Sequence, residues 1–225
     1  MTAPKIYLAR MQCEPDFVPQ FTNWYADKHT VELLEAGFLS CQYYHCDVGY
    51  PNVCNVYEIP GAELFSTNIY QHARKIDDER PAVLAHITDR SNTVYEPMCA
   101  LLPDQGGGVG HEVSPGDINA PAVAVVFFDL EGRHVDDLVA TVSADRTIWP
   151  RTGGVRRVRL CRFTAKHPNN PRDPRTWAVI AECETDCASD AAKDIRDRLH
   201  GRFQGALANV GSLAGSLSFR RVSAL

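Results

Sequence analysis

The stretch Trp24-Tyr25-Ala26-Asp27-Lys28-His29, followed by Gly37-Phe38, places an imidazole beside two aromatic side chains. Phe21 precedes it with helical spacing, so Phe21, Tyr25 and His29 would share one stripe of a helix. Gly37 is typical of the residue that follows a helix. We therefore expect a helix here that turns a chemically active face toward the rest of the fold.

The landmarks around this stretch recur 117 residues later in the chain. Ala3-Pro4 corresponds to Ala120-Pro121, Gly37 corresponds to Gly154, and each Ala-Pro pair opens an apolar run. The second copy lacks the imidazole and both aromatics, and it has instead Thr141, Val142 and Arg146. We predict a duplicated fold in which only the first copy keeps a site.

Both halves show the order strand, helix, strand, strand, helix, strand. In the first half we expect strands at 6–11, 38–45, 53–59 and 93–96, with helices from Pro15 and over 64–78. In the second half we expect strands at 123–128, 154–163, 177–183 and 216–222, with helices over 136–145 and after a capping Ser189. The predicted domains are 1–101, a Gly/Pro-rich linker over 102–119, and a degenerate copy over 120–225.

Composition and charge narrow the class of protein. Apolar residues make up 44% and charged residues 23% of the 225, which is ordinary for a soluble domain. The net charge of −5 argues against nucleic acid as a partner. No segment has the roughly 20 apolar residues of a membrane helix, and the N-terminus does not resemble a secretion signal. The eight cysteines are then expected to be free thiols of a cytoplasmic protein.

A family resemblance rests on particular residues of the first half. The run from Phe21 to His29, with Gly37-Phe38, Asn55-Val56-Tyr57-Glu58 and Thr93-Val94-Tyr95-Glu96, resembles the dimeric α+β barrel superfamily and its EthD-like members. The resemblance implies an α+β fold of two tandem ferredoxin-like βαββαβ repeats, which form an α+β barrel within one chain. A further homodimer stays open.

The resemblance leaves the reaction open, because the superfamily includes cofactor-free monooxygenases, isomerases, cyclases and haem enzymes. His29 is the candidate general base, since a neutral imidazole can take a proton from a carbon acid or a phenol. Tyr25 would assist it. The expected substrate-binding residues are Trp24, Phe21, Tyr44, His45, Tyr57 and His86. The competing explanation for His29 is a structural one, in which it stabilises the last turn of its helix.

We therefore expect an enzyme without metal or cofactor that acts on a small apolar, oxygen-bearing metabolite, for which an aromatic compound is one option. Proton transfer would drive isomerisation, cyclisation or carbon–carbon bond cleavage. The alternatives are a cofactor-free monooxygenase of the same fold and a non-catalytic protein that binds a hydrophobic ligand. A haem enzyme would need an axial ligand that the sequence does not identify. The charge run Asp77-Asp78-Glu79 is expected to face solvent.

Overall fold

The computed structural model describes residues 4–45, 51–102, 111–112, 118–130, 138–139, 153–170, 175–202 and 207–215. Its strands form one antiparallel sheet in the order β2-β3-β1-β4-β7-β8-β6-β9, and β5 pairs with β4. The strands of the first half are β1 (Lys5–Cys13), β2 (Ser40–His45), β3 (Val53–Ile59) and β4 (Ile87–Leu102). The others are β5 (His111–Glu112), β6 (Ala122–Leu130), β7 (Val155–Lys166), β8 (Trp177–Cys183) and β9 (Leu207–Gly215).

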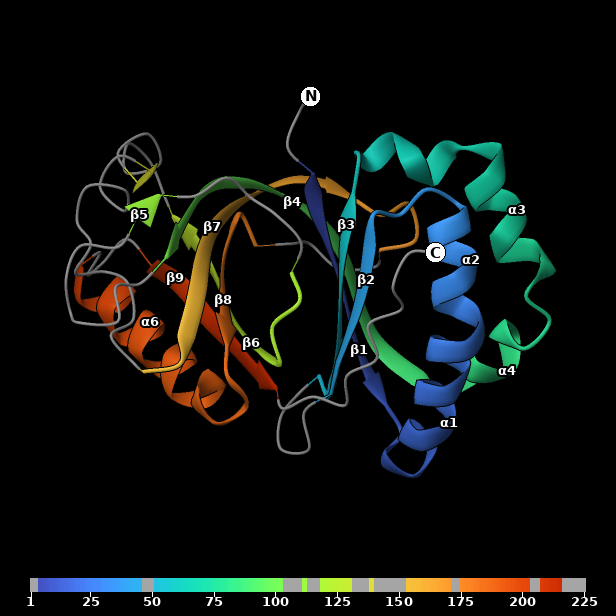
Figure 1. Ribbon diagram of the computed structural model, residues 1–225, viewed down its shortest axis with the longest axis horizontal. Helices are drawn as coiled ribbons and strands as arrows, with labels where there is room; N and C mark the ends of the chain where they lie inside the picture. The colour runs from blue at the N-terminus through green and yellow to red at the C-terminus, as the bar shows by residue number, and fades with distance from the viewer. Residues whose placement is uncertain are drawn as a thin grey trace.

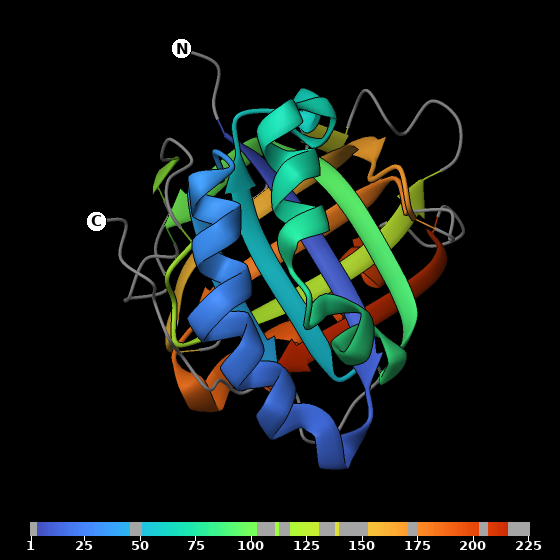
Figure 2. The ribbon, with the colours of Figure 1, turned by 90° about the vertical axis from the view of Figure 1, so that its right-hand side faces the viewer.

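Helices cover the outer faces of this sheet. In the first half they are α1 (Val18–Trp24), α2 (Thr30–Glu35), α3 (Asn68–Ile76) and α4 (Arg80–Ala85), and in the second half α6 (Ala188–Arg202). Short 3₁₀ turns stand before α1, α3 and α6, at Pro15–Phe17, Ala62–Ser66 and Thr185–Cys187. The helices α1 to α4 lie on one side of the molecule and α6 on the other, with the curled sheet between them (Figure 1). Figure 2 shows α1, α2 and α3 running across the strands of the first half.

The protein has three apolar cores: one on the inner face of the curled sheet, and one under the helices of each half on its outer face. On β1, Ile6 and Leu8 point inward and pack with residues such as Val125 and Ile180 of the second half. The alternate side chains of the same strand, such as Tyr7, pack against α1 to α4. A third core lies between α6 and the outer face of the second half. Because β1 is buried on both faces, its central run from Ile6 to Ala9 is continuously apolar, and its polar residues lie at partly buried positions.

The expected α+β fold is confirmed, and its sheet is antiparallel and curled. β3 and β8 have the predicted bounds, and both glycines of the 117-residue offset adopt the left-handed backbone region, with φ of +102° at Gly37 and +86° at Gly154. A residue with a Cβ would be strained in that region. The strand order of the first four strands, β2-β3-β1-β4, has the same pattern as β7-β8-β6-β9.

Several predicted boundaries were wrong. β4 has 16 residues rather than the expected four, because its first part pairs with β1 and its later part pairs with β7 of the second half. The segment expected as one helix over 64–78 is a 3₁₀ turn followed by α3, and α4 was missed. Ser189 lies inside α6 rather than at its cap. The predicted strand at 216–222 lies outside the described residues, as does all but 138–139 of the predicted helix at 136–145.

The described part of the chain contains seven of the cysteines, and all seven are buried free thiols. Burial raises the pKa of the Cys54 and Cys161 thiols to about 12, so both stay protonated and act as small apolar side chains. Among the described helices, none is long and apolar enough to cross a membrane.

Candidate functional site

A π-helical turn, Tyr25–His29, interrupts the first helix between α1 and α2. Thr30 supports it, because its hydroxyl donates a hydrogen bond to the Tyr25 carbonyl oxygen at 2.7 Å. The wider turn brings Trp24 and His29, five residues apart, into a stacked contact with ring centroids 4.5 Å apart and planes 11° apart. Such turns are frequent at functional sites. The π-helical turn therefore gives His29 a flat indole wall.

His29 is buried, with 8% of its surface exposed. Burial lowers its pKa well below the usual range, and the positive charges of Arg80 and Arg74 lower it further. The imidazole is thus neutral near pH 7. Arg80 Nη1 lies 3.5 Å from His29 Nδ1. A guanidinium can only donate, so this long contact faces an unprotonated Nδ1.

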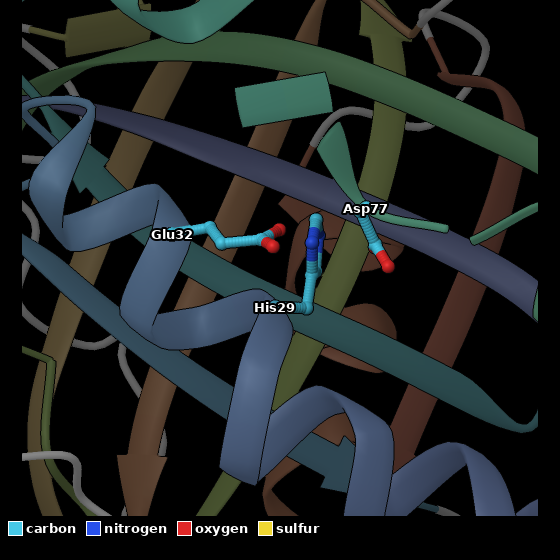
Figure 3. Close-up of side chains that lie close together, drawn as sticks. All are labelled: His29, Glu32 and Asp77. Atoms are coloured by element: carbon cyan, nitrogen blue, oxygen red, sulfur yellow. The ribbon is translucent and has the colours of Figure 1, made fainter. Parts of the chain in front are cut away.

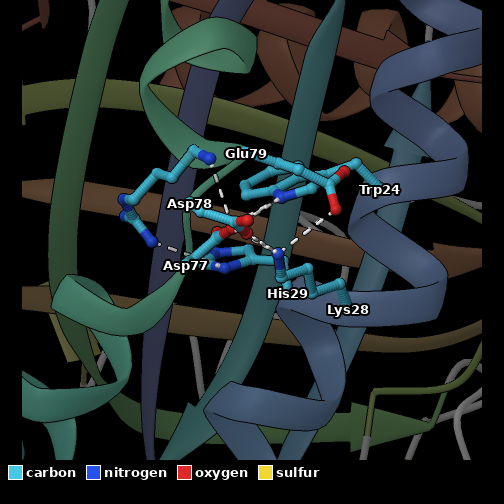
Figure 4. Close-up of polar contacts among 7 residues, drawn as sticks. Trp24, Lys28, His29, Asp77, Asp78 and Glu79 are labelled. Carbon is cyan, nitrogen blue, oxygen red and sulfur yellow. Dashed lines mark hydrogen bonds and ion pairs between the residues drawn. The ribbon is translucent and has the colours of Figure 1, made fainter.

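Asp77 fixes the indole wall from behind. Its carboxylate accepts from Trp24 Nε1 at 3.2 Å and pairs with Lys28 Nζ at 3.2 Å (Figure 4). It also accepts from the Arg80 backbone N–H at 3.2 Å. The expectation that Asp77 faces solvent was wrong, since its side chain is 0% exposed. Lys28 and the two N–H donors supply the partners that a buried carboxylate needs.

A cavity of about 90 Å³ lies between the helices and the sheet of the first half. Its aromatic wall consists of Tyr7, Phe21, Trp24, Phe38, Tyr57 and Tyr70. Its polar lining consists of His29, Asn55, Asn92, His167 and Asn169, together with Arg74, Arg80 and Arg90. The cavity is large enough for several waters or a small organic ring.

Four of the eight expected site residues line this cavity: Phe21, Trp24, His29 and Tyr57. Tyr25 does not line it and packs behind, against the rings of Phe21 and Tyr43. Burial raises the pKa of the Tyr25 hydroxyl well above its usual range, so the group stays protonated. That hydroxyl makes no hydrogen bond of normal geometry with the described residues.

The structure does not bring Tyr44, His45 or His86 to the cavity. Tyr44 is on the inner face of the sheet, where its hydroxyl donates to the Ala120 carbonyl oxygen at 3.3 Å. His45 is the last residue of β2 and lies away from the lining. His86 stacks on Phe17 at 3.9 Å and pairs with an exposed glutamate, Glu14, at 2.7 Å. The alternation of side chains along β2 explains the position of Tyr44, and the location of His86 directly after α4 explains that of His86.

Sequence reasoning missed the cationic rim and the contribution of the second half. Arg74 and Arg80 come from α3 and α4, and none of Arg74, Arg80 or Arg90 forms an ion pair with a described carboxylate. His167 follows β7, and its backbone N–H donates to the Asn92 carbonyl oxygen at 3.1 Å. No local motif marks His167, because only the pairing of β4 with β7 brings it to the cavity.

One group of potential metal ligands occurs in the described part of the chain: His29, Glu32 and Asp77, whose ligand atoms all lie within 4.8 Å of one another (Figure 3). Two cationic side chains already contact this group, Lys28 at Asp77 and Arg80 at His29. Burial and then the charge of Asp77 raise the pKa of Glu32. The group is therefore better suited to moving a proton than to holding a divalent ion, and the absence of a metal remains a prediction.

Comparison with known proteins supports the fold. No protein-family model matches the chain, and no curated protein matches it. An anthrone oxidase-like protein superposes with a TM-score of 0.67 at 12% identity, over 100% of this chain and 95% of that one. A monooxygenase-like protein from Lactobacillus acidophilus NCFM superposes with a TM-score of 0.55 at 11% identity, over 98% and 99%. A variant of chlorite dismutase from Candidatus Nitrospira defluvii gives 0.57 at 13% identity, over 96% and 92%.

These similarities place the chain in the ferredoxin-like α+β barrel fold and, at such low identities, show the fold alone. The expected ferredoxin-like α+β fold is confirmed. The EthD-like relationship remains a prediction. The chemistry has to be argued from the cavity itself.

Proposed function

We propose that this protein is a cofactor-independent oxygenase that acts on a small aromatic carbon acid bearing a phenol or ketone oxygen. One observation carries the proposal: a neutral, buried His29 stacked on Trp24 shares an aromatic cavity with arginine side chains that have no described carboxylate partner. Aromatic walls suit a planar ring. Arginines suit the negative oxygen that appears once the ring system loses a proton.

His29 would act as the base in the first step. It removes a proton from the carbon acid, and the electron pair of the broken C–H bond moves onto the ring system and its oxygen. Arg80, whose Nη1 lies 3.5 Å from His29 Nδ1, can swing onto that oxygen and uncover the lone pair of Nδ1. The carboxyl of Glu32, close to His29 and only partly buried, can carry the proton to solvent.

Molecular oxygen would complete the reaction as the oxidant. The carbanion gives its electrons to O₂, and a C–O bond forms as a peroxide that takes up a proton. Loss of the second C–H proton then breaks the O–O bond, which yields a ketone and water. A CH₂ group and O₂ are consumed, and C=O and H₂O are formed. The structurally similar anthrone oxidase-like protein suggests an anthrone as the substrate type. The three fused rings of an anthrone need more room than the cavity of about 90 Å³ provides, so its binding requires the cavity to widen.

The second candidate is proton transfer without oxygen, leading to isomerisation, cyclisation or carbon–carbon cleavage with the same His29 base. The cavity supports both candidates equally. The structural similarity to oxidase-like and monooxygenase-like proteins favours the reaction with oxygen. A non-catalytic ligand-binding role is the third candidate, and it would not use His29 as a base.

A haem role receives no support from the imidazoles of this cavity. His167 has both ring nitrogens engaged, one by the Asn169 N–H at 3.1 Å and the other by the Tyr70 hydroxyl at 2.9 Å. His29 lies between the indole of Trp24 and the guanidinium of Arg80. An axial bond to iron would therefore have to displace the Asn169 N–H or the Tyr70 hydroxyl from His167, or the Arg80 guanidinium from His29.

We also infer that the two halves are tandem ferredoxin-like repeats that build one intrachain barrel. The shared strand-order pattern, the left-handed Gly37 and Gly154, and the core between the two inner faces support this inference. Separate expression of the two halves would test whether either one keeps its sheet alone.

The proposed reaction is tested with anthrone under air and under argon after dialysis against a chelator. Oxygen uptake equal to the anthraquinone formed, unchanged by the chelator, is the expected result. Turnover at the same rate without oxygen would favour the proton-transfer candidate. Binding without any turnover would favour the ligand-binding role. Loss of activity on chelation, restored by a divalent ion, would contradict the prediction of a metal-free site.

A further inference from the structure

A hydrogen-bonded chain from the second half ends on a tyrosine of the cavity. The backbone N–H of Asn169 donates to His167 Nδ1 at 3.1 Å, and His167 Nε2 lies 2.9 Å from the Tyr70 hydroxyl oxygen. His167 and Tyr70 are both buried, with 4% of each exposed. All three residues line the cavity.

The direction of these bonds follows from what each group can donate. A backbone N–H only donates, so His167 Nδ1 has to be the acceptor and carries no proton. Burial lowers the pKa of His167 to about 4, so the ring is neutral near pH 7 and its single proton sits on Nε2. His167 therefore donates to the oxygen of Tyr70. The tautomer of a histidine ring is often ambiguous. Here the Asn169 N–H excludes the tautomer that carries its proton on Nδ1.

The hydroxyl of Tyr70 then keeps its own proton for another partner. Among the described residues, none accepts a hydrogen bond from it. Burial raises the pKa of Tyr70, so the hydroxyl remains a donor near neutral pH. The guanidinium of Arg74 lies over the same ring, 5.8 Å from its centroid. A directed O–H and a guanidinium thus come from one helix, α3, to one side of the cavity.

We propose that Tyr70 donates a hydrogen bond to the substrate oxygen and stabilises the negative charge that forms there, while His167 directs the Tyr70 proton toward it. This inference rests on the proposed function and adds a catalytic residue and a positioning residue to it. The ligand class is an aromatic compound with a phenolic or enolic oxygen. The second half of the chain thereby completes a site whose base lies in the first half.

The experiment uses Tyr70→Phe, which removes only the hydroxyl, and His167→Phe, which keeps a ring against Tyr7 and Phe65 but removes both nitrogens. The matched control is Tyr95→Phe. The Tyr95 hydroxyl is also buried between the halves and donates to the Arg175 carbonyl oxygen at 3.1 Å, but it does not line the cavity. Melting temperatures show whether each variant folds.

Turnover of anthrone is the first readout. Loss of one oxyanion donor lowers kcat by about 10² to 10³, with a smaller change in KM. We expect this loss for Tyr70→Phe and a smaller one for His167→Phe. We expect no further loss when His167→Phe is added to Tyr70→Phe, because His167 acts through Tyr70. Equal losses from His167→Phe in both backgrounds would overturn the positioning role.

Binding of 4-nitrophenol is the second readout and needs no catalysis. Its phenolate is yellow, so absorbance reports its ionisation in the cavity. Wild type and His29→Ala should both bind it with an increased phenolate fraction, and Tyr70→Phe should lose much of that increase. Full kcat and an unchanged phenolate fraction in a folded Tyr70→Phe would overturn this inference alone. If wild type neither bound the phenol nor turned over anthrone, both the proposed function and this inference would fail.

Discussion

The second helical region of each half packs on its sheet with different side chains. In the second half, α6 presses Ala191, Ala192 and Ile195 directly onto the sheet, and all three are almost fully buried. In the first half, α3 buries only Tyr70. Aromatic rings and arginine side chains lie between helix and sheet in the first half, whereas alanine side chains lie there in the second half.

This difference shows how one architecture can be either a plain layer or a site. Small side chains let a helix approach the sheet, and the close contact leaves no room for a ligand. In the first half, bulky aromatic side chains and arginines surround a cavity of about 90 Å³. The strand-order pattern is the same in both halves, so the side chains rather than the topology create the cavity.

The largest expected effect is at His29, the base in the first half. His29→Ala and His29→Gln should lower turnover by about 10² to 10⁴. If His29 only stabilised its helix, the cost would be about 0.3 to 1 kcal/mol of stability, with activity kept. Steady-state kinetics and a melting curve on each variant separate the two. His86→Gln, which changes an imidazole outside the cavity, is the control.

Substitutions at two alanines test the difference between the packed helix layer of the second half and the cavity of the first half. Ala191→Leu in the packed second half should lower the free energy of unfolding by about 1 to 3 kcal/mol and leave turnover unchanged, because no space exists for the extra carbons. Ala9→Leu in the first half points into the cavity. It should raise KM with little loss of stability. Lys193→Leu, exposed on α6, controls for the added side chain. A stability loss at Ala9→Leu equal to that at Ala191→Leu would remove the distinction.

The strands could be predicted from the sequence because their pattern and turns are local. Apolar runs bounded by turn residues gave the bounds of β3 and β8 correctly. The length of β4 was out of reach, since Thr88 and Arg90 are exposed and only pairing with neighbouring strands extends the strand. A local sequence pattern predicts the bounds of a strand whose ends are marked by turn residues. It does not predict how far a strand continues when that length depends on pairing with strands distant in the sequence.

The site was predicted only in part for the same reason. Helical periodicity placed His29 near Trp24, but the stacked contact depends on a π-helical turn that a 3.6-residue period does not contain. The burial of Asp77 depends on Lys28 and Trp24, some fifty positions away. His167 could not be assigned to the cavity without the β4–β7 pairing.

The pH dependence of stability tests whether His167, a second-half residue that contacts Tyr70 of the first half, is buried as a neutral imidazole. The pKa of His167 is about 4 in the folded protein, against 6.5 for an ordinary histidine. The unfolded chain therefore binds a proton before the folded one does, so stability is full above pH 6.5 and is lost as the pH falls toward 4. In this window His167 should contribute a slope of about 1.4 kcal/mol per pH unit.

The measurement is the free energy of unfolding of wild type and His167→Phe across that window. The variant should show a shallower decline, since it lacks the group that takes up the proton. His29, whose pKa burial also lowers, adds a decline of the same sign that both proteins share. Parallel curves for the two proteins would mean that His167 is not buried as a neutral ring, and the tautomer assigned to it would lose its basis.

The smallest expected effect is at Tyr44, which lies on the inner face of the sheet rather than in the cavity. Tyr44→Phe removes a hydroxyl that donates to the Ala120 carbonyl oxygen at 3.3 Å. Loss of one such bond should lower the free energy of unfolding by about 0.5 to 1.5 kcal/mol. Because the ring stays in the core between the halves, kcat and KM should not change. A rise in KM would instead place Tyr44 in contact with the substrate, and the inner face of the sheet, rather than the helix-covered face, would then hold the ligand.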